Sequence, residues 1–495
     1  MVTSPRRTAR ILTAEQAATR VWDLVVIGAG SAGLVGAKSA AHLGARVLIV
    51  EAHRFGGECL HTGCVPSKAL IAAASAAHSA REGGELGVSA TVRVDFPAVM
   101  AHVRRAIAAI APVDSPEALA GEGVFSVQGR ATFAAPRTVV VDGRAIRFRD
   151  ALVATGSSPR LPDAPGVGGV DVLTNETFWD LDEQPARLLV NGGGAVGCEI
   201  AQAMARLGST VTVVHRGERL LEKEEPRASA IVLDALRADG VDVRLGVSVT
   251  EWAGEEGSTG PTAGGLARLS DGAEVRFDRV LAALGRRVDT SGLGLDAAGV
   301  RLDDSGAIVV DRTMRTSNPR IRAAGDTTPL PRFTHTAGMY ASVAATNAVL
   351  GLRRAIESDA VPRVTFTAPE VAAVGVAPAD AADRGLRVVV QPNREVDRAI
   401  ADGRTEGYTA VVLDRRSRVR GAVVVGPRAG ETLAELTVAT RLGLTAGALA
   451  GTIHAYPTYS DAGWSAVVAD TRRALSGGAV GLAIRLLRVI RRRRD

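Results

Sequence analysis

The feature that most constrains the fold is a pattern that the chain contains twice. Each copy is an apolar strand, a glycine-rich turn, an apolar helical stretch and a second strand that ends on a polar residue. The first copy runs from Gly28 to Glu51 and the second from Gly192 to His215, and each interval is 23 residues. This arrangement is typical of a dinucleotide-binding βαβ unit. We therefore expect an α/β fold with two Rossmann-like dinucleotide-binding domains.

In the first copy, three glycines and one acid occupy the positions that contact a dinucleotide. Gly28, Gly30 and Gly33 allow a tight turn, close approach of the backbone to a pyrophosphate, and close packing of the helix on the strand. Glu51 follows strand 46–50, and its carboxylate can accept hydrogen bonds from both ribose hydroxyls. Strand, helix, second strand and terminal acid together predict a dinucleotide site.

The second copy keeps the glycines, as Gly192, Gly194 and Gly197, but ends differently. His215 stands where a site for NADH would have its carboxylate, and Arg216 follows it. The missing acid removes the acceptor for the ribose hydroxyls, whereas a guanidinium can bind a 2′-phosphate. The second site is therefore predicted to bind NADPH, with NADH less favoured. The alternative is that Arg216 is a solvated surface residue.

Two of the three cysteines, Cys59 and Cys64, stand five residues apart just after the first copy. A straight helix would separate their Cα atoms by more than the roughly 7 Å that a disulfide spans. Cys59 is therefore expected in a turn before a helix, with Gly63 folding Cys64 back towards it. Cys64 would fall in the first turn of the helix, where unpaired N–H groups and the dipole stabilise a thiolate, and Lys68 would follow on the same face. The alternative is a pair of merely buried cysteines.

Residues 56–68, GGECLHTGCVPSK, directly follow a dinucleotide-binding unit. In this they resemble the FAD domain of the flavoprotein pyridine nucleotide–disulfide oxidoreductases, and the resemblance covers roughly residues 20 to 475. It implies FAD in the first domain, NAD(P)H in the second, and a redox disulfide between Cys64, facing the flavin, and Cys59, meeting the substrate. It also implies that Glu199 pairs with Lys68 beside the flavin. Arg216 matches one arginine of NADPH-dependent relatives, but Glu222 stands at the second such position.

The resemblance implies further contacts with the cofactors. Asp326 would hold the ribityl chain of FAD, and the helix from about His335 to Leu350 would direct its N-terminal amides at the flavin. His335 would tune the flavin or serve only in capping and packing. The remaining implied cofactor-binding positions are Gly57, Gly156, Gly285, Gly325 and Ala337.

The same resemblance divides the chain. The FAD domain is expected at 20–160 and again at 285–352, the NAD(P)H domain at 161–284, an α/β dimerisation domain at 360–475, and a basic tail at 476–495. The chain is expected to form a homodimer in which this third domain completes the partner's active site. Loop 253–265 is rich in Gly, Ser and Thr, so its tip is expected to be disordered. Cys198, inside an apolar helix, is predicted to be core packing.

The segment 454–461, HAYPTYSD, departs from the family pattern His-Pro-Thr-x-x-Glu. Tyr456 stands at the position of the acid–base histidine and Asp461 at that of its orienting glutamate. The ordinary pKa of a tyrosine side chain is about 10, against about 6.5 for histidine, so tyrosine cannot easily shuttle protons near neutrality. If the backbone is extended before Pro457, His454 points to the same side as Tyr456 and becomes an alternative base.

These residues leave the electron acceptor open. A small disulfide or an Hg(II)-like ion is expected, although the additional C-terminal cysteine pair of mercuric reductase is absent, since the last cysteine is Cys198. No resident metal is predicted. The alternatives are direct reduction of quinone-like acceptors by the flavin, or a slow redox sensor or membrane-associated electron carrier.

Composition narrows the partners. Three cysteines in 495 residues, with no apolar segment after the N-terminal arginines, predict a cytoplasmic enzyme. The net charge is +6, but residues 485–495 hold six arginines and one aspartate, so the body carries only +1 and nucleic-acid binding is not expected. The tail, apolar from Val480 to Ile490, is too short to span a bilayer. It would contact an anionic membrane weakly, dock on the dimer, or fray.

Overall fold

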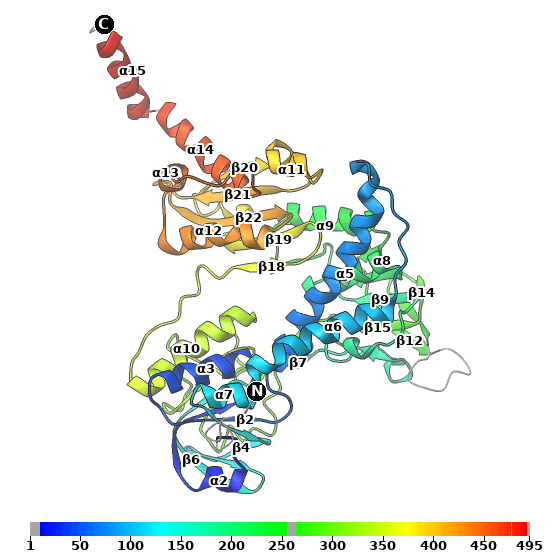
Figure 1. Cartoon of the computed structure of the whole chain (residues 1–495), viewed down its shortest axis with the longest axis vertical. Helices are drawn as coiled ribbons and strands as arrows, with labels where there is room; N and C mark the ends of the chain where they lie inside the picture. Colours follow the sequence, from blue (N-terminus) through cyan, green and yellow to red (C-terminus); the bar gives the residue numbers. More distant parts are fainter. Residues whose placement is uncertain (1–9, 255–263, 477, 493–495) are drawn as a thin grey trace. The chain divides into compact units, whose positions relative to one another are not determined.

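The computed structural model describes residues 10–254, 264–476 and 478–492 (Figure 1). The chain forms two compact units. The first comprises residues 1–192, 206–209 and 249–356, and the second comprises residues 193–205, 210–248 and 357–495. The predicted tip of loop 253–265 falls at residues 255–263, outside the described residues. The predicted division into FAD, NAD(P)H and dimerisation domains remains a prediction.

The main sheet of the first unit has seven strands. β1 and β2 are almost wholly apolar and buried, as expected for parallel strands covered on both faces. Strands β3, β2, β1 and β6 are parallel in that order, β17 also runs parallel to β6, and β5 and β4 continue from β6 as antiparallel strands. Their bounds are β1 Val21–Ile27, β2 Val47–Glu51, β3 Phe125–Gln128, β4 Ala131–Ala135, β5 Thr138–Val141, β6 Arg144–Val153 and β17 Ile321–Ala323.

Two helices cover one face of this sheet. α3 (Ser31–His42) and α10 (Thr334–Leu350) pack on each other through small residues, because a Cβ added at Gly36 would lie 3.5 Å from the Cβ of Ala341. Both helices contribute to one buried cluster with Leu24, Val26 and Leu152. The short helix α2 (Ala14–Ala18) belongs to a second buried cluster of the first unit. The sequence predicted α10 to within one residue.

The Ala-rich region after the cysteines is helical and is interrupted by a glycine-rich break. Its elements are α4 Gly57–His61, α5 Cys64–Glu82, η1 Gly83–Leu86, α6 Phe96–Ile110, η2 Ala111–Asp114 and α7 Pro116–Gly121. Among the described residues, one stretch, Phe96–Gly121, is long and apolar enough to cross a membrane. Here Pro112 and Pro116 stand where it divides into α6, η2 and α7.

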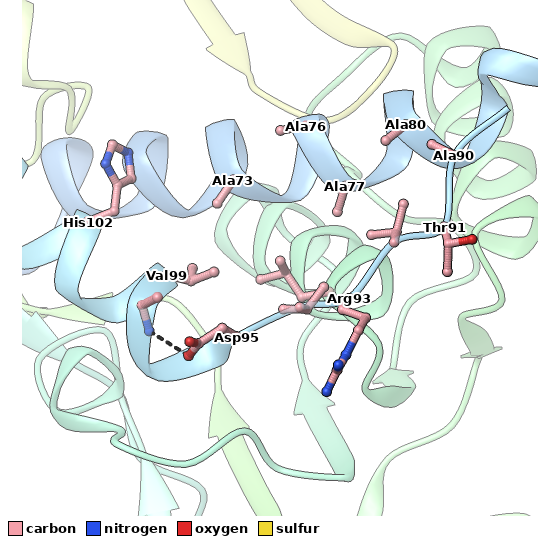
Figure 2. A pocket seen from close by; sticks show the side chains of 14 residues that line it. Ala73, Ala76, Ala77, Ala80, Ala90, Thr91, Arg93, Asp95, Val99 and His102 are labelled. Carbon is pink, nitrogen blue, oxygen red and sulfur yellow. Dashed lines mark hydrogen bonds between the residues drawn. The ribbon is translucent and has the colours of Figure 1, made fainter. Parts of the chain in front are cut away.

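A groove of about 540 Å³ lies between α5 and α6 (Figure 2). Alanines of α5 form much of one wall, and His102 and Val99 of α6 contribute to the other. Asp95 at its edge caps α6 by accepting a hydrogen bond of 3.0 Å from the amide of Ala98. The groove contains neither cysteine of the predicted redox pair.

The rest of the first unit consists of short sheets. β9, β15 and β8 are parallel, β12, β13 and β14 form an antiparallel sheet, and β16 pairs with β7. The bounds are β7 Ser158–Pro159, η3 Val167–Gly169, β8 Val172–Leu173, η4 Phe178–Asp180, β9 Arg187–Asn191, β12 Val249–Gly254, β13 Gly265–Leu269, β14 Glu274–Phe277, β15 Arg279–Ala282 and β16 Arg286–Arg287.

The second unit has a parallel pair, β10 and β11, and an antiparallel five-stranded sheet in the order β18, β19, β22, β21 and β20. α12 and α14 contribute to its core, and Arg387 of β20 forms two hydrogen bonds, of 2.8 and 2.9 Å, with Asp470 of α14. The bounds are α8 Ala195–Leu207, β10 Thr210–His215, α9 Pro226–Ala238, β11 Asp242–Leu245, β18 Arg363–Thr365, β19 Glu370–Gly375, η5 Pro378–Asp380, β20 Arg387–Pro392, η6 Asn393–Glu395, α11 Asp397–Ala401, β21 Tyr408–Leu413, β22 Val419–Gly426, α12 Ala429–Leu442, α13 Ala446–Ala450, α14 Asp461–Ser476 and α15 Gly478–Arg492.

Candidate active site

The first glycine-rich turn forms a cradle at the start of α3. A Cβ added at Gly33 would lie 1.8 Å from the carbonyl oxygen of Gly28, so this position packs helix against strand. A Cβ added at Gly30 would meet only the Cα of Gly57, at 3.8 Å. Gly30 is the N-cap of α3 and has no side chain to cap the helix. The free amides at this helix end are therefore suited to a phosphate.

Glu51 is held at the end of β2 by two backbone amides. Its Oε2 accepts a hydrogen bond of 2.6 Å from the amide of Ala29, and its Oε1 accepts one of 2.7 Å from the amide of His53. The carboxylate is buried. The uncapped start of α3 and the open position at Gly30 fit the pyrophosphate of FAD, and the fixed carboxylate of Glu51 fits its ribose. The contacts predicted for Gly57, Gly156, Gly325 and Ala337 stay predictions.

The two cysteines lie together, by a route that differs in part from the prediction. Cys64 is the first residue of α5, as expected. Cys59 was expected in a turn, but it lies inside the short helix α4, and Thr62 and Gly63 make the turn. A Cβ at Gly63 would come within 3.0 Å of the Glu58 carbonyl oxygen and 3.4 Å of the Cys59 Cα. This close approach brings Cys64 back to Cys59.

Both cysteines are thiols, and their neighbours set their chemistry. The hydrogen bond between the Cys59 thiol and Cys64, together with burial, raises the pKa of Cys59, so Cys59 keeps its proton at neutral pH. The Cys64 sulfur lies 3.3 Å from the Thr334 hydroxyl at the start of α10. The hydroxyls of Thr334 and of Ser31, the first residue of α3, lower the pKa of Cys59 in part. The starts of three helices therefore meet at this pair.

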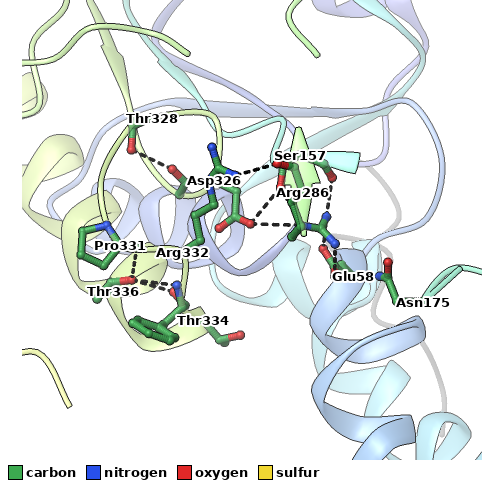
Figure 3. A network of polar contacts seen from close by, with 12 residues as sticks. Glu58, Ser157, Asn175, Arg286, Asp326, Thr328, Pro331, Arg332, Thr334 and Thr336 are labelled. Atoms are coloured by element: carbon green, nitrogen blue, oxygen red, sulfur yellow. Dashed lines mark hydrogen bonds and ion pairs between the residues drawn. The ribbon is translucent and has the colours of Figure 1, made fainter. Parts of the chain in front are cut away.

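A polar network joins Glu58 of α4, the helix that contains Cys59, to distant parts of the first unit (Figure 3). The Glu58 carboxylate binds the Arg286 guanidinium through both oxygens, at 2.6 and 2.5 Å, and accepts a hydrogen bond of 2.9 Å from Asn175. Arg286 also donates to the Ser157 hydroxyl at 2.7 Å and lies 3.4 Å from Asp326. The residue predicted to hold the ribityl chain is therefore linked to the residue beside Cys59.

Sequence reasoning missed this role of Glu58. The one signal was a charged residue between the glycines and the first cysteine of the motif. Loss of hydration raises the pKa of Glu58 to about 7 despite the attraction of Arg286 and although 40% of the side chain is exposed. The negative charges of Asp326 and Glu176 act in the same direction, as does that of Cys64 when its thiol is ionised.

In the second glycine-rich turn, His215 occupies the place that Glu51 has in the first. Its Nδ1 accepts a hydrogen bond of 3.2 Å from the amide of Gly193, and both this bond and the one from Ala29 to Glu51 join residues 22 apart. Burial lowers the pKa of His215. The ring is therefore neutral, with its proton on Nε2.

Nε2 is buried and makes no hydrogen bond of good geometry with the described residues, although the Arg219 backbone is close enough to raise the pKa of His215 in part. The Glu222 carboxylate lies 3.9 Å away, beyond hydrogen-bond distance, and its side chain is 56% exposed. Arg216 is exposed beside it. A buried N–H donor next to a guanidinium fits an incoming anion.

Tyr456 and Asp461 of the last motif form separate hydrogen bonds, and their predicted catalytic roles stay predictions. The Tyr456 hydroxyl donates a hydrogen bond of 2.6 Å to Asp397, and this bond raises the pKa of Tyr456. Asp461, the first residue of α14 and the residue at the family's glutamate position, accepts a hydrogen bond of 3.1 Å from the amide of Thr458. Asp397 precedes Tyr456 by 59 residues, so no local pattern indicates the contact.

The alternative base, His454, is also engaged. Its Nε2 lies 2.8 Å from Glu435 of α12, and its Nδ1 lies 2.9 Å from the carbonyl oxygen of Thr452. The side chain is 11% exposed. His454 and Tyr456 therefore bind different acidic partners within the second unit, and the tyrosine is the exposed one of the two.

Three further predictions concern the pairing of Lys68 with Glu199, the role of His335 and the burial of Cys198. Lys68 of the first unit donates a hydrogen bond of 3.3 Å to the Ser67 hydroxyl, and Glu199 of the second accepts one of 2.9 Å from the amide of Phe366, so their pairing stays a prediction. The ring of His335 stacks on Phe333, with centroids 5.2 Å apart, which favours packing over tuning. Cys198 is fully buried, and burial raises its pKa to about 12, as expected of a core cysteine.

Comparisons with known proteins agree with this geometry. Residues 22–341 match the family described as pyridine nucleotide-disulphide oxidoreductase, and residues 361–467 match the dimerisation domain of that family. The chain is 38% identical to a mercuric reductase of Streptomyces lividans over 89% of this chain and 94% of the relative. It is 35% identical to a dihydrolipoyl dehydrogenase of Chlamydia muridarum over 89% and 95%.

The fold is also similar to a solved structure, LpdA from Mycobacterium tuberculosis. The TM-score is 0.82 at 29% identity, and the match covers 90% of this chain and 98% of that one. The family uses FAD and a nicotinamide coenzyme and contains a redox disulfide, and the matched dimerisation domain supports a homodimer. The cradle at α3, the cysteine pair at α5 and these matches along most of the chain lead to one conclusion: the protein is an enzyme of the pyridine nucleotide-disulphide oxidoreductase family.

Proposed function

We propose that this enzyme passes electrons from NADPH through FAD to the Cys59–Cys64 disulfide, and from the resulting dithiol to a small acceptor. The observation that carries the proposal is the hydrogen-bonded pair of thiols at the start of α5, beside the starts of α3 and α10. In balance, NADPH and one proton reduce the disulfide to two thiols and leave NADP⁺. Bound FAD would supply the two-electron relay between them.

The chain's own residues would divide this work. The Cys64 thiolate would be stabilised by the N-terminus of α5 and by the Thr334 hydroxyl. Cys59, which keeps its proton near neutral pH, would release it on attacking the acceptor. Glu58 is adjacent in sequence and has a pKa near 7, so it can take up or return a proton in the working range.

The choice of electron acceptor depends on Tyr456, which stands at the position of the family's acid–base histidine. Reducing a disulfide requires protonation of a departing thiolate, and Tyr456, whose hydrogen bond to Asp397 raises its pKa, is a poor acid–base group near neutrality. An acceptor that binds thiolates directly does not need this group. We therefore favour a soft ion such as Hg(II), the substrate in the name of the Streptomyces lividans relative, over a small disulfide.

A second candidate is direct reduction of a quinone-like acceptor. No group of three or more His, Cys, Asp or Glu side chains that could hold a metal ion occurs in the described part of the chain. A soft ion would thus have only the two sulfurs of the pair as thiolate ligands, whereas a quinone needs none. Steady-state rates with Hg(II), oxidised lipoamide, glutathione disulfide and benzoquinone separate the three acceptor classes.

We propose NADPH as the coenzyme. The buried Nε2–H of His215 and the exposed guanidinium of Arg216 belong to residues adjacent in sequence, and both can donate hydrogen bonds to a 2′-phosphate. Glu222, 3.9 Å from His215, opposes this choice by its charge, but its exposed side chain is free to turn towards water.

The test of the redox pair is an anaerobic titration with dithionite. The wild type is expected to take four electrons per FAD, with a long-wavelength thiolate–flavin band at the two-electron stage. Cys64→Ser is expected to lose the band and to take two electrons. A wild-type endpoint at two electrons would show that the cysteines are not a redox pair.

A further inference from the structure

The last helix, α15 (Gly478–Arg492), carries large apolar side chains in solvent. Leu482, Leu486 and Leu487 are 67%, 60% and 64% exposed, and Val489 and Ile490 are also exposed. In Figure 1 the helix continues the chain beyond α14, at the C-terminal end of the second unit. Soluble proteins rarely expose a contiguous group of large apolar side chains, so α15 is suited to binding a partner.

Apolar and basic residues separate on opposite sides of α15. Leu482, Leu486 and Ile490 are spaced by four and therefore share a face, which Leu487 and Val489 widen. The charged side consists of Arg485, Arg488 and Arg492, which are spaced by three and four, while Arg491 follows Leu487 by four and lies at the edge of the apolar face. No acidic residue lies between Gly478 and Arg492.

We propose that α15 binds the surface of an anionic phospholipid membrane. The helix would lie in the plane of the membrane, with its leucines among the acyl chains and its arginines at the lipid phosphates. At 15 residues it is about 22 Å long, which is shorter than the roughly 30 Å of a bilayer core, so it does not span.

The charges of α15 argue against the other occupants. A second copy of α15 packed on the apolar face would cover the leucines but would leave the arginines of both helices without acidic partners in the helix. A nucleic acid would pair with the arginines but would leave the apolar face in water. An anionic membrane satisfies both faces at once.

The experiment uses purified full-length holoenzyme and vesicles, with the flavin absorbance of pellet and supernatant as the measure of binding. Wild-type enzyme is expected to sediment with vesicles of phosphatidylglycerol and phosphatidylcholine, and to remain in solution with phosphatidylcholine alone. Binding to the anionic vesicles is expected to fall as salt rises.

Two variants separate the faces of the helix. Arg485→Gln with Arg488→Gln is expected to weaken partitioning about thirtyfold, at about fivefold per arginine. Leu486→Asp is expected to weaken it at least tenfold, since a leucine is withdrawn from the acyl chains. Leu86→Asp, at a 70% exposed leucine of η1, is the matched control and is expected to bind as wild type.

Three results would overturn the proposal. Equal binding to neutral and anionic vesicles would remove the role of the arginines. Sedimentation unchanged by deleting residues 479–495 would place the binding elsewhere. A loss of self-association on this deletion, without vesicle binding by the wild type, would assign the face to a second copy of the chain.

Discussion

Gly33 and Gly30 lie three residues apart in one turn, yet the structure predicts that alanine at each fails for a different reason. A Cβ at Gly33 would lie 1.8 Å from the carbonyl oxygen of Gly28. That atom belongs to the backbone and cannot rotate away, so α3 must shift by more than about 1 Å from β1, and overpacking of this kind costs about 1–3 kcal/mol or more. Gly33→Ala is therefore expected to destabilise the apoprotein by about 3 kcal/mol.

At Gly30 the added Cβ would have only an ordinary contact, 3.8 Å from the Cα of Gly57, and the backbone is extended at φ −81° and ψ −169°. The apoprotein is expected to lose little stability. The methyl group would, however, stand between the α3 amides and a pyrophosphate, and losing one charged hydrogen bond of about 1.5–3 kcal/mol weakens FAD about ten- to a hundredfold.

The assay has two parts. Flavin absorbance after desalting reports bound FAD, and urea unfolding of the apoprotein, followed by tryptophan fluorescence, reports stability. Gly30→Ala should lose FAD and keep the unfolding midpoint, and Gly33→Ala should lose both. A Gly33→Ala apoprotein with the wild-type midpoint would refute the steric argument, and a Gly30→Ala protein that retains FAD at dilution would refute the cradle.

Three further outcomes are expected. Arg216→Ala should weaken NADPH about ten- to a hundredfold and NADH far less, and equal changes in KM would contradict the assignment. Burial raises the pKa of Glu58 from 4.5 to about 7, so the stability that protonated Glu58 contributes is complete below pH 4.5 and is lost as the pH rises through 7. Glu58→Gln should therefore flatten the plot of Tm against pH in this range. An unchanged plot would exclude Glu58 as the source of the pH dependence. Tyr456→His should raise lipoamide reduction relative to quinone reduction, whereas ordinary lipoamide rates in the wild type that survive His454→Ala would show that neither side chain limits disulfide reduction.

The sequence predicted those parts of the fold whose cause is local. The strand before Glu51 and the helix from about His335 to Leu350 were placed to within one residue, because apolar runs and flanking turns determine them. Cys64 at the start of α5 followed from the five-residue spacing and Gly63. Local sequence patterns therefore predict where a strand or helix lies and where a helix begins.

Side-chain partners distant in sequence were not predictable in the same way. Arg286 binds Glu58 across 228 residues, and Tyr456 binds Asp397 across 59. In both cases the hydrogen bond depends on where the sheet and loops place two chain segments, and the segments themselves carry no pattern that specifies the partner. The carboxylate of Asp461, in contrast, accepts a hydrogen bond from the amide of Thr458, three residues before it, and its predicted role in catalysis stays a prediction.

The two glycine-rich turns show how one residue can set the coenzyme. In both, the amide of the residue after the first glycine donates to a side chain 22 positions later, Glu51 in one turn and His215 in the other. A carboxylate held in this way still has lone pairs for ribose hydroxyls, whereas a neutral imidazole has only its Nε2 proton left and suits a phosphate oxygen.

His215→Glu should therefore reverse the coenzyme preference. The variant keeps the bond to the Gly193 amide, gains an acceptor for the ribose hydroxyls, and loses a donor to the 2′-phosphate, so the ratio of kcat/KM for NADPH to that for NADH should fall at least about tenfold. Arg216 is left in place, which keeps this test separate from that of the guanidinium. If the ratio does not change, the buried Nε2 proton of His215 does not face the coenzyme, and the preference must come from Arg216 alone.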